Sequence, residues 1–528
     1  MVGLLLRVVA IIGGLGMGAC AMLAPAMAVE RLNFSWVSNV GPLNPHGYSP
    51  NQMFAQAMVY EPLVRYRADG TIAPWLALSW EIFDDGRSAQ FHLRKDVTFS
   101  NGEPFNAAAV AANFEAILKD RESHSWLELA NQIASVEVTG PYSVLLRLKE
   151  PYYPLLQELA LPRPFRFVAP SQFINGGTME GIVAPIGTGP WVLSQTRPGE
   201  HDLFIRNERY WGQKPAYDEI DVKVISDPNS RAIAFEIGDI DLIYGVDGPI
   251  SPDNFQRFAA MPKISSALSG PMETRLIALN SKSGPTRDLA VRKAINHGVD
   301  KDAIIATILY NTETRADALY APNVPYANIG LAPYLYDPAK SIALLEEAGW
   351  VLEPGSGLRS RNGEALKLDL VFTGTDAISK SIAEIIQAQL ATIGIGVFLI
   401  GEEESSVTAR QHDGRFGMIF SQTFGAAYDP HAHLSSMRTP SHADYQAQLG
   451  LHDKAQLDAR IGQALLSRDE ATRQALYANI LNRLHEEAIY LPLTYVAIMA
   501  LGRPGVKNIS FSALSSEIPF ERFAPALD

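Results

Sequence analysis

Cysteine is almost absent from this sequence, because Cys20 is the only one in 528 residues. It lies in an N-terminal segment typical of an export signal, in which Arg7 precedes an apolar stretch and Ala26 and Ala28 form a small-x-small cleavage site. We expect residues 1–28 to be removed, leaving a mature chain without cysteine. That chain would have no disulfides and no thiolate metal ligand, so a metal would need imidazole, carboxylate or ligands from a small molecule.

A lipid anchor is the alternative for this N-terminus, since lipoprotein signals end at a cysteine. Met17 stands three residues before Cys20, where such signals prefer leucine, and we therefore favour a soluble exported protein. After the signal, no apolar run reaches the length that crosses a membrane.

Basic charge and catalytic motifs are also scarce. The net charge of −13 argues against nucleic-acid binding, which needs a basic face. The segment 187–190 (GTGP) lacks the lysine of a phosphate-binding loop, and His485 is followed by two glutamates without the second histidine of a zinc protease. A Gly-x-Ser-x-Gly elbow is missing too. These absences favour a binding protein over an enzyme, although an exported hydrolase with a triad assembled from distant residues remains an alternative.

What the sequence does contain is an alternation of apolar strands and amphipathic helices, with 47% hydrophobic residues over a length sufficient for about three compact units. A strand is predicted at 219–224 and a helix at 230–237. Asp337 and Gly349 bound another helix as its N-cap and C-terminal glycine. Strands at 366–372 and 395–400 flank a helix over 376–394, which is a β-α-β unit with parallel strands.

Several segments resemble the solute-binding protein family that serves peptide and nickel ABC importers. They are 60–64 (YEPLV), 74–77 (PWLA), 99–105 (FSNGEPF), 187–191 (GTGPW), 238–241 (GDID) and 348–350 (AGW). The likeness covers nearly the whole mature chain in the family's order. It implies an α/β, type II periplasmic binding protein fold of the large peptide/nickel cluster, with two hinge-connected lobes. Lobe one is expected at 29–272, with 498–528 returning to it, and lobe two at 273–497.

Within that family the chain is similar to the nickel branch. The segments that carry this likeness are 40–46 (VGPLNPH), 126–132 (WLELANQ), 159–167 (LALPRPFRF), 401–406 (GEEESS) and 435–444 (SSMRTPSHAD). The resemblance implies a periplasmic, non-catalytic and monomeric protein that carries nickel as a chelate with a small organic molecule, such as histidine or a polycarboxylate. Its partners would be an inner-membrane permease and ATPase. The alternative within the family is a di- or oligopeptide-binding protein, and signalling to a chemoreceptor also remains open.

The nickel branch implies a site as well. His442, in a turn-like segment, matches the histidine that donates to the metal, and neutral imidazole is a good nickel ligand. Arg163 matches the cation that grips the chelator's carboxylate. The walls of the cleft are expected to be formed by Tyr48, Met53, Trp126, Phe424, Tyr428 and Ser516.

Three positions depart from the branch. Ser123 stands where a second arginine is usual, with Arg121 nearby but out of register, and Phe424 and Ser516 replace a tryptophan and a threonine. Loss of one guanidinium predicts an altered preference among chelators.

His431 and His433 form a His-x-His pair. On a strand they would share a face and could add metal ligands. We favour the simpler expectation that His431 packs near the hinge and His433 is solvated.

Overall fold

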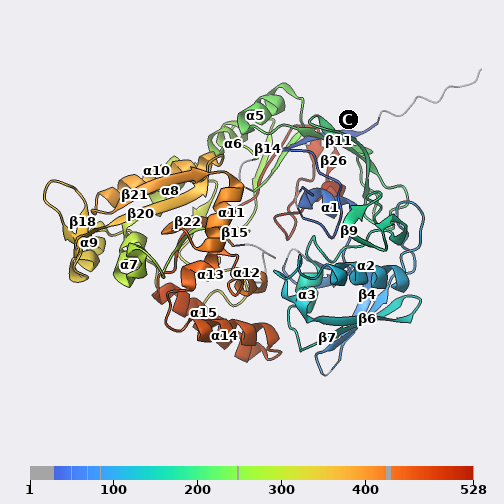
Figure 1. The fold of residues 1–528 in the computed structure, drawn as a ribbon. Coiled ribbons are helices and arrows are strands. Elements are labelled where there is room, and N and C mark those ends of the chain that lie inside the picture. The colour runs from blue at the N-terminus through green and yellow to red at the C-terminus, as the bar shows by residue number, and fades with distance from the viewer. Residues whose placement is uncertain are drawn as a thin grey trace, which may run out of the picture.

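The computed structural model describes residues 29–526, apart from residues 49, 68, 84, 247–248 and 424–429. Figure 1 shows two lobes side by side, each built from sheets and helices, which confirms the α/β class and the two-lobe arrangement. The expected signal segment, 1–28, lies outside the described residues. Among the described helices, none combines the length and apolar character needed to span a membrane.

The N-terminal lobe contains two four-stranded sheets. In the first, β1 runs parallel to β12 while the remaining pairs are antiparallel; the second is wholly antiparallel. The first sheet contains, in spatial order, β1 (Arg31–Trp36), β12 (Glu219–Val224), β11 (His201–Arg206) and β10 (Trp191–Arg197); the second contains β4 (Ala77–Ile82), β5 (Ser88–Leu93), β7 (Ser143–Leu148) and β6 (Ile133–Gly140). The helices here are α1 (Met53–Val59), α2 (Ala107–Lys119), α3 (Glu128–Gln132) and α4 (Leu155–Leu159), and the short strands are β2 (Val64–Tyr66), β3 (Ile72–Pro74), β8 (Phe173–Ile174) and β9 (Gly177–Ile182).

The second lobe is organised around one six-stranded mixed sheet. Its strands, in spatial order, are β16 (Thr314–Arg315), β23 (Tyr490–Val496), β15 (Glu273–Leu279), β22 (Met418–Gln422), β20 (Lys367–Thr373) and β21 (Gly396–Glu402). Its helices are α7 (Leu289–Gly298), α8 (Lys301–Thr307), α9 (Pro338–Glu347), α10 (Ala377–Ala391), α11 (Glu404–Asp413), α12 (His431–Ser436), α13 (Ala443–Gln448), α14 (Lys454–Leu466) and α15 (Glu470–Glu486). A small sheet of β17 (Val351–Leu352), β18 (Arg359–Arg361) and β19 (Glu364–Ala365) lies at its far end (Figure 1).

The elements predicted from local sequence signals are confirmed. Strand β12 is observed as predicted, and a helix, α5 (Pro228–Ile237), follows it. Strands β20 and β21 pair in parallel around α10, as the β-α-β pattern indicates. Asp376 caps α10, since its carboxylate accepts from the backbone N–H of Ile378 and of Ser379 at 3.0 Å. Gly394 follows that helix with φ +85°, a conformation that suits glycine.

The lobes are joined through a three-stranded sheet of β13 (Leu242–Gly245), β24 (Met499–Gly502) and β14 (Ser265–Leu268), beside α6 (Pro252–Ala259). The chain leaves this sheet from β14 to β15 and returns from β23 to β24. The two crossing segments lie side by side, because Met272 N–H donates to Val496 O at 2.9 Å and Ser269 N–H to Ile498 O at 3.1 Å. Such paired segments are typical of a hinge.

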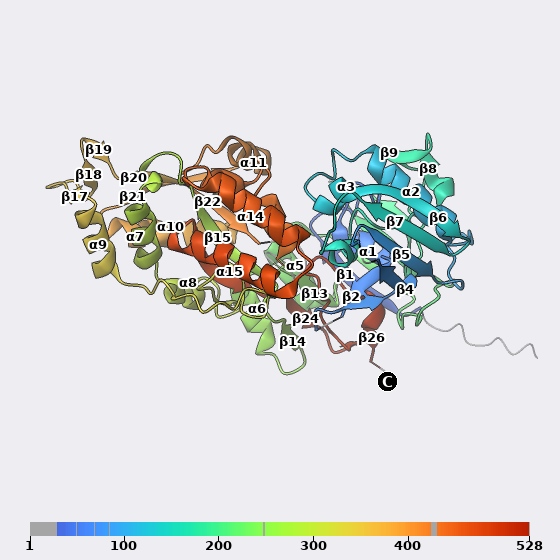
Figure 2. The same ribbon diagram turned by 90° about the horizontal axis from the view of Figure 1, so that it is seen from below.

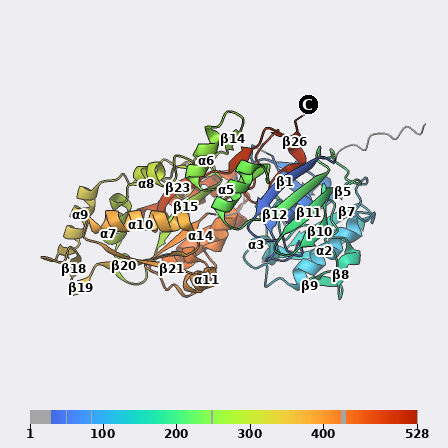
Figure 3. The same ribbon diagram turned by 90° about the horizontal axis from the view of Figure 1, so that it is seen from above.

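The C-terminal segment, with β25 (Val506–Lys507) and β26 (Ala524–Pro525), returns to the N-terminal lobe, as the views from below and from above show (Figures 2 and 3). Phe520 and Phe523 are buried in the same apolar cluster as Leu32 and Phe34 of β1. Residues from the two ends of the chain therefore share one core.

The glycines of the 187–190 segment have a packing role. A Cβ built on Gly187 would lie 2.0 Å from the carbonyl oxygen of Val59, at the end of α1. The N–H of Gly189 donates to that same oxygen at 2.8 Å. Close backbone approach therefore accounts for glycine at both positions.

Candidate functional site

A pocket of about 440 Å³ lies between the lobes. From the N-terminal lobe it is lined by the loop before α1, the loops before α3 and after α4, and the C-terminal segment; from the second lobe, by the ends of two strands and the start of α13. The lining residues are Tyr48, Met53, Ser123, Trp126, Leu161, Pro162, Arg163, Glu273, Gln422, His442, Leu514, Ser515 and Ser516. The structure thus brings together six of the residues predicted from sequence, namely Tyr48, Met53, Trp126, Arg163, His442 and Ser516.

A hydrogen-bonded chain orders the aromatic wall. Trp126 Nε1–H donates to the hydroxyl of Tyr48 at 2.6 Å, and that hydroxyl lies 2.8 Å from His124 Nδ1. Burial raises the pKa of Tyr48 to about 12 and lowers the pKa of His124. Tyr48 therefore remains protonated beside a neutral His124, and one of the two donates the hydrogen bond that joins them. His124 was missed by sequence reasoning, because it supports the wall from behind and does not line the pocket.

Arg163 stands against this wall with its guanidinium available. Its Cζ lies 4.8 Å from the centre of the Tyr48 ring, a cation–π distance. Within the described part of the chain, its only hydrogen bond is a long one, 3.5 Å from Nη1 to Asn51 O. Burial lowers its pKa, but an arginine remains charged at any physiological pH. The pocket thus holds a cation whose donors can bind a carboxylate.

His442 faces Arg163 from the other lobe. It occupies the N-cap position of α13, with its N–H bonded to Thr439 O at 3.0 Å, so the turn-like segment predicted from sequence is confirmed. The side chain is half-buried, and burial lowers its pKa, with the charge of Asp444 opposing the shift. The imidazole is therefore neutral at neutral pH, which is the form that binds a metal.

Two polar residues of the second-lobe wall were not predicted. Glu273 begins β15 and accepts from Ser515 Oγ at 2.5 Å, and Gln422 ends β22. Neither residue lies in one of the segments that resemble the nickel branch, so the sequence did not indicate a role for either. Glu273 gives the pocket a carboxylate opposite Arg163, so the pocket offers both signs of charge.

The departures from the nickel branch have clear positions. Ser123 lines the pocket, so the missing arginine would have faced it. Arg121 does not replace that arginine, because its guanidinium donates to the carbonyl oxygens of Ala130, Asn131 and Ile133 around the end of α3. Two predicted wall residues, Phe424 and Tyr428, lie outside the described residues.

The His-x-His pair lies on helix α12 rather than on a strand, so the two rings do not share a face. His431 is fully buried, with Nε2 3.4 Å from a carboxylate oxygen of Glu158 in the N-terminal lobe. The expectation that His433 is solvated is wrong: it is fully buried, and its Nδ1 lies 2.8 Å from the hydroxyl of Tyr320. Among the described residues, no three His, Cys, Asp or Glu side chains gather in an arrangement that could hold a metal.

Two α/β lobes joined by paired crossing segments, with a pocket at their interface, define the class of two-lobed solute-binding proteins. The chain belongs to the bacterial extracellular solute-binding proteins, family 5, whose model matches residues 71–445.

Individual relatives agree with this family. The chain is 56% identical over 508 residues to the nickel-binding periplasmic protein of Escherichia coli strain K12, covering 96% of this chain and 97% of the relative. It is 25% identical to a glutathione-binding protein, GsiB, of Salmonella choleraesuis, over 91% of this chain and 92% of the relative.

Solved structures of related proteins have a similar fold. NikA from Brucella suis in complex with Fe(III)-EDTA superposes with a TM-score of 0.93 and 66% identity, over 94% of this chain and all (100%) of that one. NikZ from Campylobacter jejuni in complex with Ni(L-His) has a TM-score of 0.80 at 22% identity, over 94% and 99% of the two chains, and shares the fold.

Proposed function

We propose that this protein binds nickel as a complex with a small organic chelator in the interlobe pocket, and delivers it to an ABC importer. The observation that carries the proposal is the position of one neutral imidazole, His442, across the pocket from a charged guanidinium, Arg163. The imidazole supplies one nickel ligand, the chelator supplies the others, and Arg163 binds the chelator's carboxylate. The Escherichia coli relative, named for nickel binding, supports the choice of metal.

The side chains that line the pocket suit a ligand that packs against aromatic rings and carries both signs of charge. Tyr48 and Trp126 present rings held by the hydrogen bond that Trp126 Nε1–H donates to the Tyr48 hydroxyl, and Met53 adds an apolar wall. Arg163 and Glu273 carry opposite charges, which suits a chelator with a carboxylate and a protonated or N–H-bearing group, such as histidine. A chelator with several carboxylates would meet one arginine instead of two.

Delivery follows from closure of the lobes. A ligand that contacts Arg163 in one lobe and His442 in the other stabilises the closed state by contacts that the open state lacks. We propose lobe one at 29–272 with 498–528 and lobe two at 273–497, which places the boundaries beside the crossing segments. The importer's permease and ATPase would recognise the closed form. Export to the periplasm with cleavage after Ala28, a monomeric state and the lack of catalysis complete the proposal.

Calorimetry with the purified protein tests the proposal. Nickel with histidine should bind tightly, nickel with a citrate-like acid more weakly, and bare aqueous nickel weakest, because the protein donates a single imidazole. Equal and tight binding of bare nickel would contradict the role of the chelator. Tight binding of mixed di- or tripeptides, unaffected by nickel, would instead identify a peptide-binding protein.

A further inference from the structure

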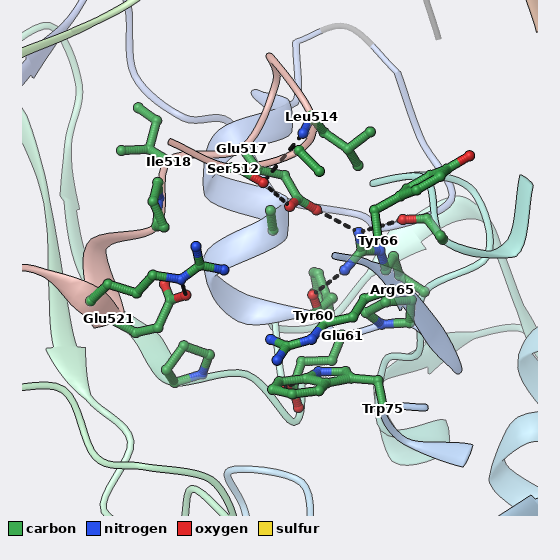
Figure 4. A pocket seen from close by; sticks show the side chains of 18 of the residues that line it. Tyr60, Glu61, Arg65, Tyr66, Trp75, Ser512, Leu514, Glu517, Ile518 and Glu521 are labelled. Atoms are coloured by element: carbon green, nitrogen blue, oxygen red, sulfur yellow. Dashed lines mark hydrogen bonds and ion pairs between the residues drawn. The ribbon is translucent and has the colours of Figure 1, made fainter. Parts of the chain in front are cut away.

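A second cavity, of about 290 Å³, lies within the N-terminal lobe. Figure 4 shows its walls, formed by the end of α1 with β2, by Trp75 and by the C-terminal segment 511–522. Leu514 lines both this cavity and the interlobe pocket, whereas Ser515 and Ser516 face only the latter. The segment 511–522 therefore separates two distinct cavities.

Three carboxylates line this cavity, and two of them, Glu61 and Glu517, already accept hydrogen bonds from protein donors. Glu61 accepts from Trp75 Nε1–H and Trp211 Nε1–H at 2.8 Å and from the Tyr210 hydroxyl at 3.1 Å. Burial raises its pKa to about 7, against the effect of these donors, so at neutral pH it carries only part of a charge. Glu517 accepts from Arg166 Nη2–H and from Ser512 Oγ–H, both at 2.9 Å.

The guanidinium of Arg65, in contrast to these carboxylates, lacks hydrogen-bond partners in the described protein. It lies flat over the Trp75 ring, with Cζ 3.4 Å from the ring centre (Figure 4). Stacking uses the face of the guanidinium and leaves the N–H donors at its edge. From 29 to 526, outside the gaps given above, no residue accepts a hydrogen bond from the Arg65 guanidinium or forms an ion pair with it, although the Arg65 backbone pairs with β3. The cavity thus contains a half-buried cation whose donors still need oxygen acceptors.

Arg522 adds a second guanidinium from the C-terminal segment. Its Nε forms a 3.5 Å ion pair with the carboxylate of its neighbour Glu521, and the guanidinium donates no hydrogen bond to the described residues. Burial lowers the pKa of Arg65, and the charge of Arg522 lowers it further, so the two cations repel each other; the carboxyl groups of Glu521 and Glu61 oppose this shift without forming an ion pair with Arg65. Two like charges facing one cavity favour a bound anion between them.

We propose that this cavity binds a small oxyanion, a carboxylate or a phosphate, between Arg65 and Arg522. A planar guanidinium binds either group through two parallel N–H···O bonds. A volume of about 290 Å³ suits a small acid or inorganic phosphate. The proposal is independent of the function proposed for the interlobe pocket.

The test uses calorimetry with inorganic phosphate and with citrate, at constant ionic strength, in the Arg163→Gln protein. This background removes the carboxylate-binding arginine of the interlobe pocket and needs no nickel. Adding Arg65→Gln or Arg522→Gln should weaken binding at least about tenfold, the value of a lost charge-assisted hydrogen-bond pair. Adding Arg87→Gln, which removes an exposed arginine paired with Glu150, should leave the affinity for the anion unchanged.

Arg522 is exposed, so its variant is expected to fold even where Arg65→Gln does not. Binding of phosphate alone, or of citrate alone, would support the site and identify the class of anion. The proposal is overturned by any of three results: neither anion binds, both arginine variants bind as the background does, or the anion binds the wild type but not the Arg163→Gln protein.

Discussion

Replacing Arg163 with alanine should weaken binding of the chelator whether or not nickel is present. The guanidinium is held by a ring 4.8 Å away and by one 3.5 Å hydrogen bond, so most of its donors can bind the ligand. Hydrogen bonds to a charged group contribute about 1.5–3 kcal/mol, which corresponds to roughly a 10- to 150-fold rise in Kd. Arg163→Lys keeps the charge but loses the planar fork, and an intermediate effect is expected.

His442→Ala supplies the contrast. Loss of the imidazole removes a metal ligand and leaves the chelator's carboxylate contact intact. Removing only a supporting group around a metal weakens its binding by about 10- to 100-fold, so loss of a direct ligand should have at least that effect on the nickel chelate. Binding of the free chelator should stay the same.

Calorimetry of the wild type and both variants, with nickel–histidine and with histidine alone, gives the comparison. Arg87→Ala, at an exposed ion pair, serves as the control and should behave as the wild type. If Arg163→Ala binds both ligands as the wild type does, or if His442→Ala retains full affinity for the nickel chelate, the reasoning about the pocket is wrong.

Further predictions concern chelator choice, pH and packing. Ser123→Arg should place a second guanidinium at the pocket and raise affinity for nickel with a citrate-like acid by about tenfold relative to nickel–histidine; an unchanged ratio in competition calorimetry would count against the assignment of that position. Burial lowers the pKa of His46 to about 4, so between pH 6.5 and pH 4 the unfolded chain binds a proton that the folded protein does not, and the free energy of unfolding should fall by about 3 kcal/mol over that range. Urea titrations of His46→Gln should show a flatter dependence on pH, and an identical slope would show that His46 does not carry this effect. Gly187→Ala should lower the free energy of unfolding by about 1–3 kcal/mol or more, since its Cβ would meet a carbonyl oxygen at 2.0 Å, whereas Gly270→Ala, with nothing within 4 Å, should have little effect; equal melting temperatures would contradict the packing role.

Local signals predicted the fold where caps and periodicity agree. Asp376 and Gly394 bound α10, and the apolar strands beside it pair in parallel as expected. The relation between the two lobes depends on backbone pairing between residues such as Met272 and Val496, which lie far apart in the sequence. No local pattern encodes that pairing, and only the family resemblance indicated it.

The candidate site also contains residues that the sequence predicted and residues that it did not. Arg163 and His442 were predicted because the segments around them resemble the nickel branch, and they line one pocket in the structure. Glu273 lines the same pocket but carries no sequence signal, because it is an ordinary strand residue whose position depends on the fold. His433 was predicted to be solvated and is instead buried against Tyr320, 113 residues away. Contacts at that separation decide burial and are not visible in a two-residue spacing.

The most direct test of the central claim is a crystal structure of the protein with nickel and histidine, with anomalous data collected at the nickel edge. The account predicts closed lobes, an anomalous peak within bonding distance of an imidazole nitrogen of His442, and the chelator's carboxylate on Arg163. A nickel peak outside the interlobe pocket, or one in the pocket without contact to His442, would contradict it.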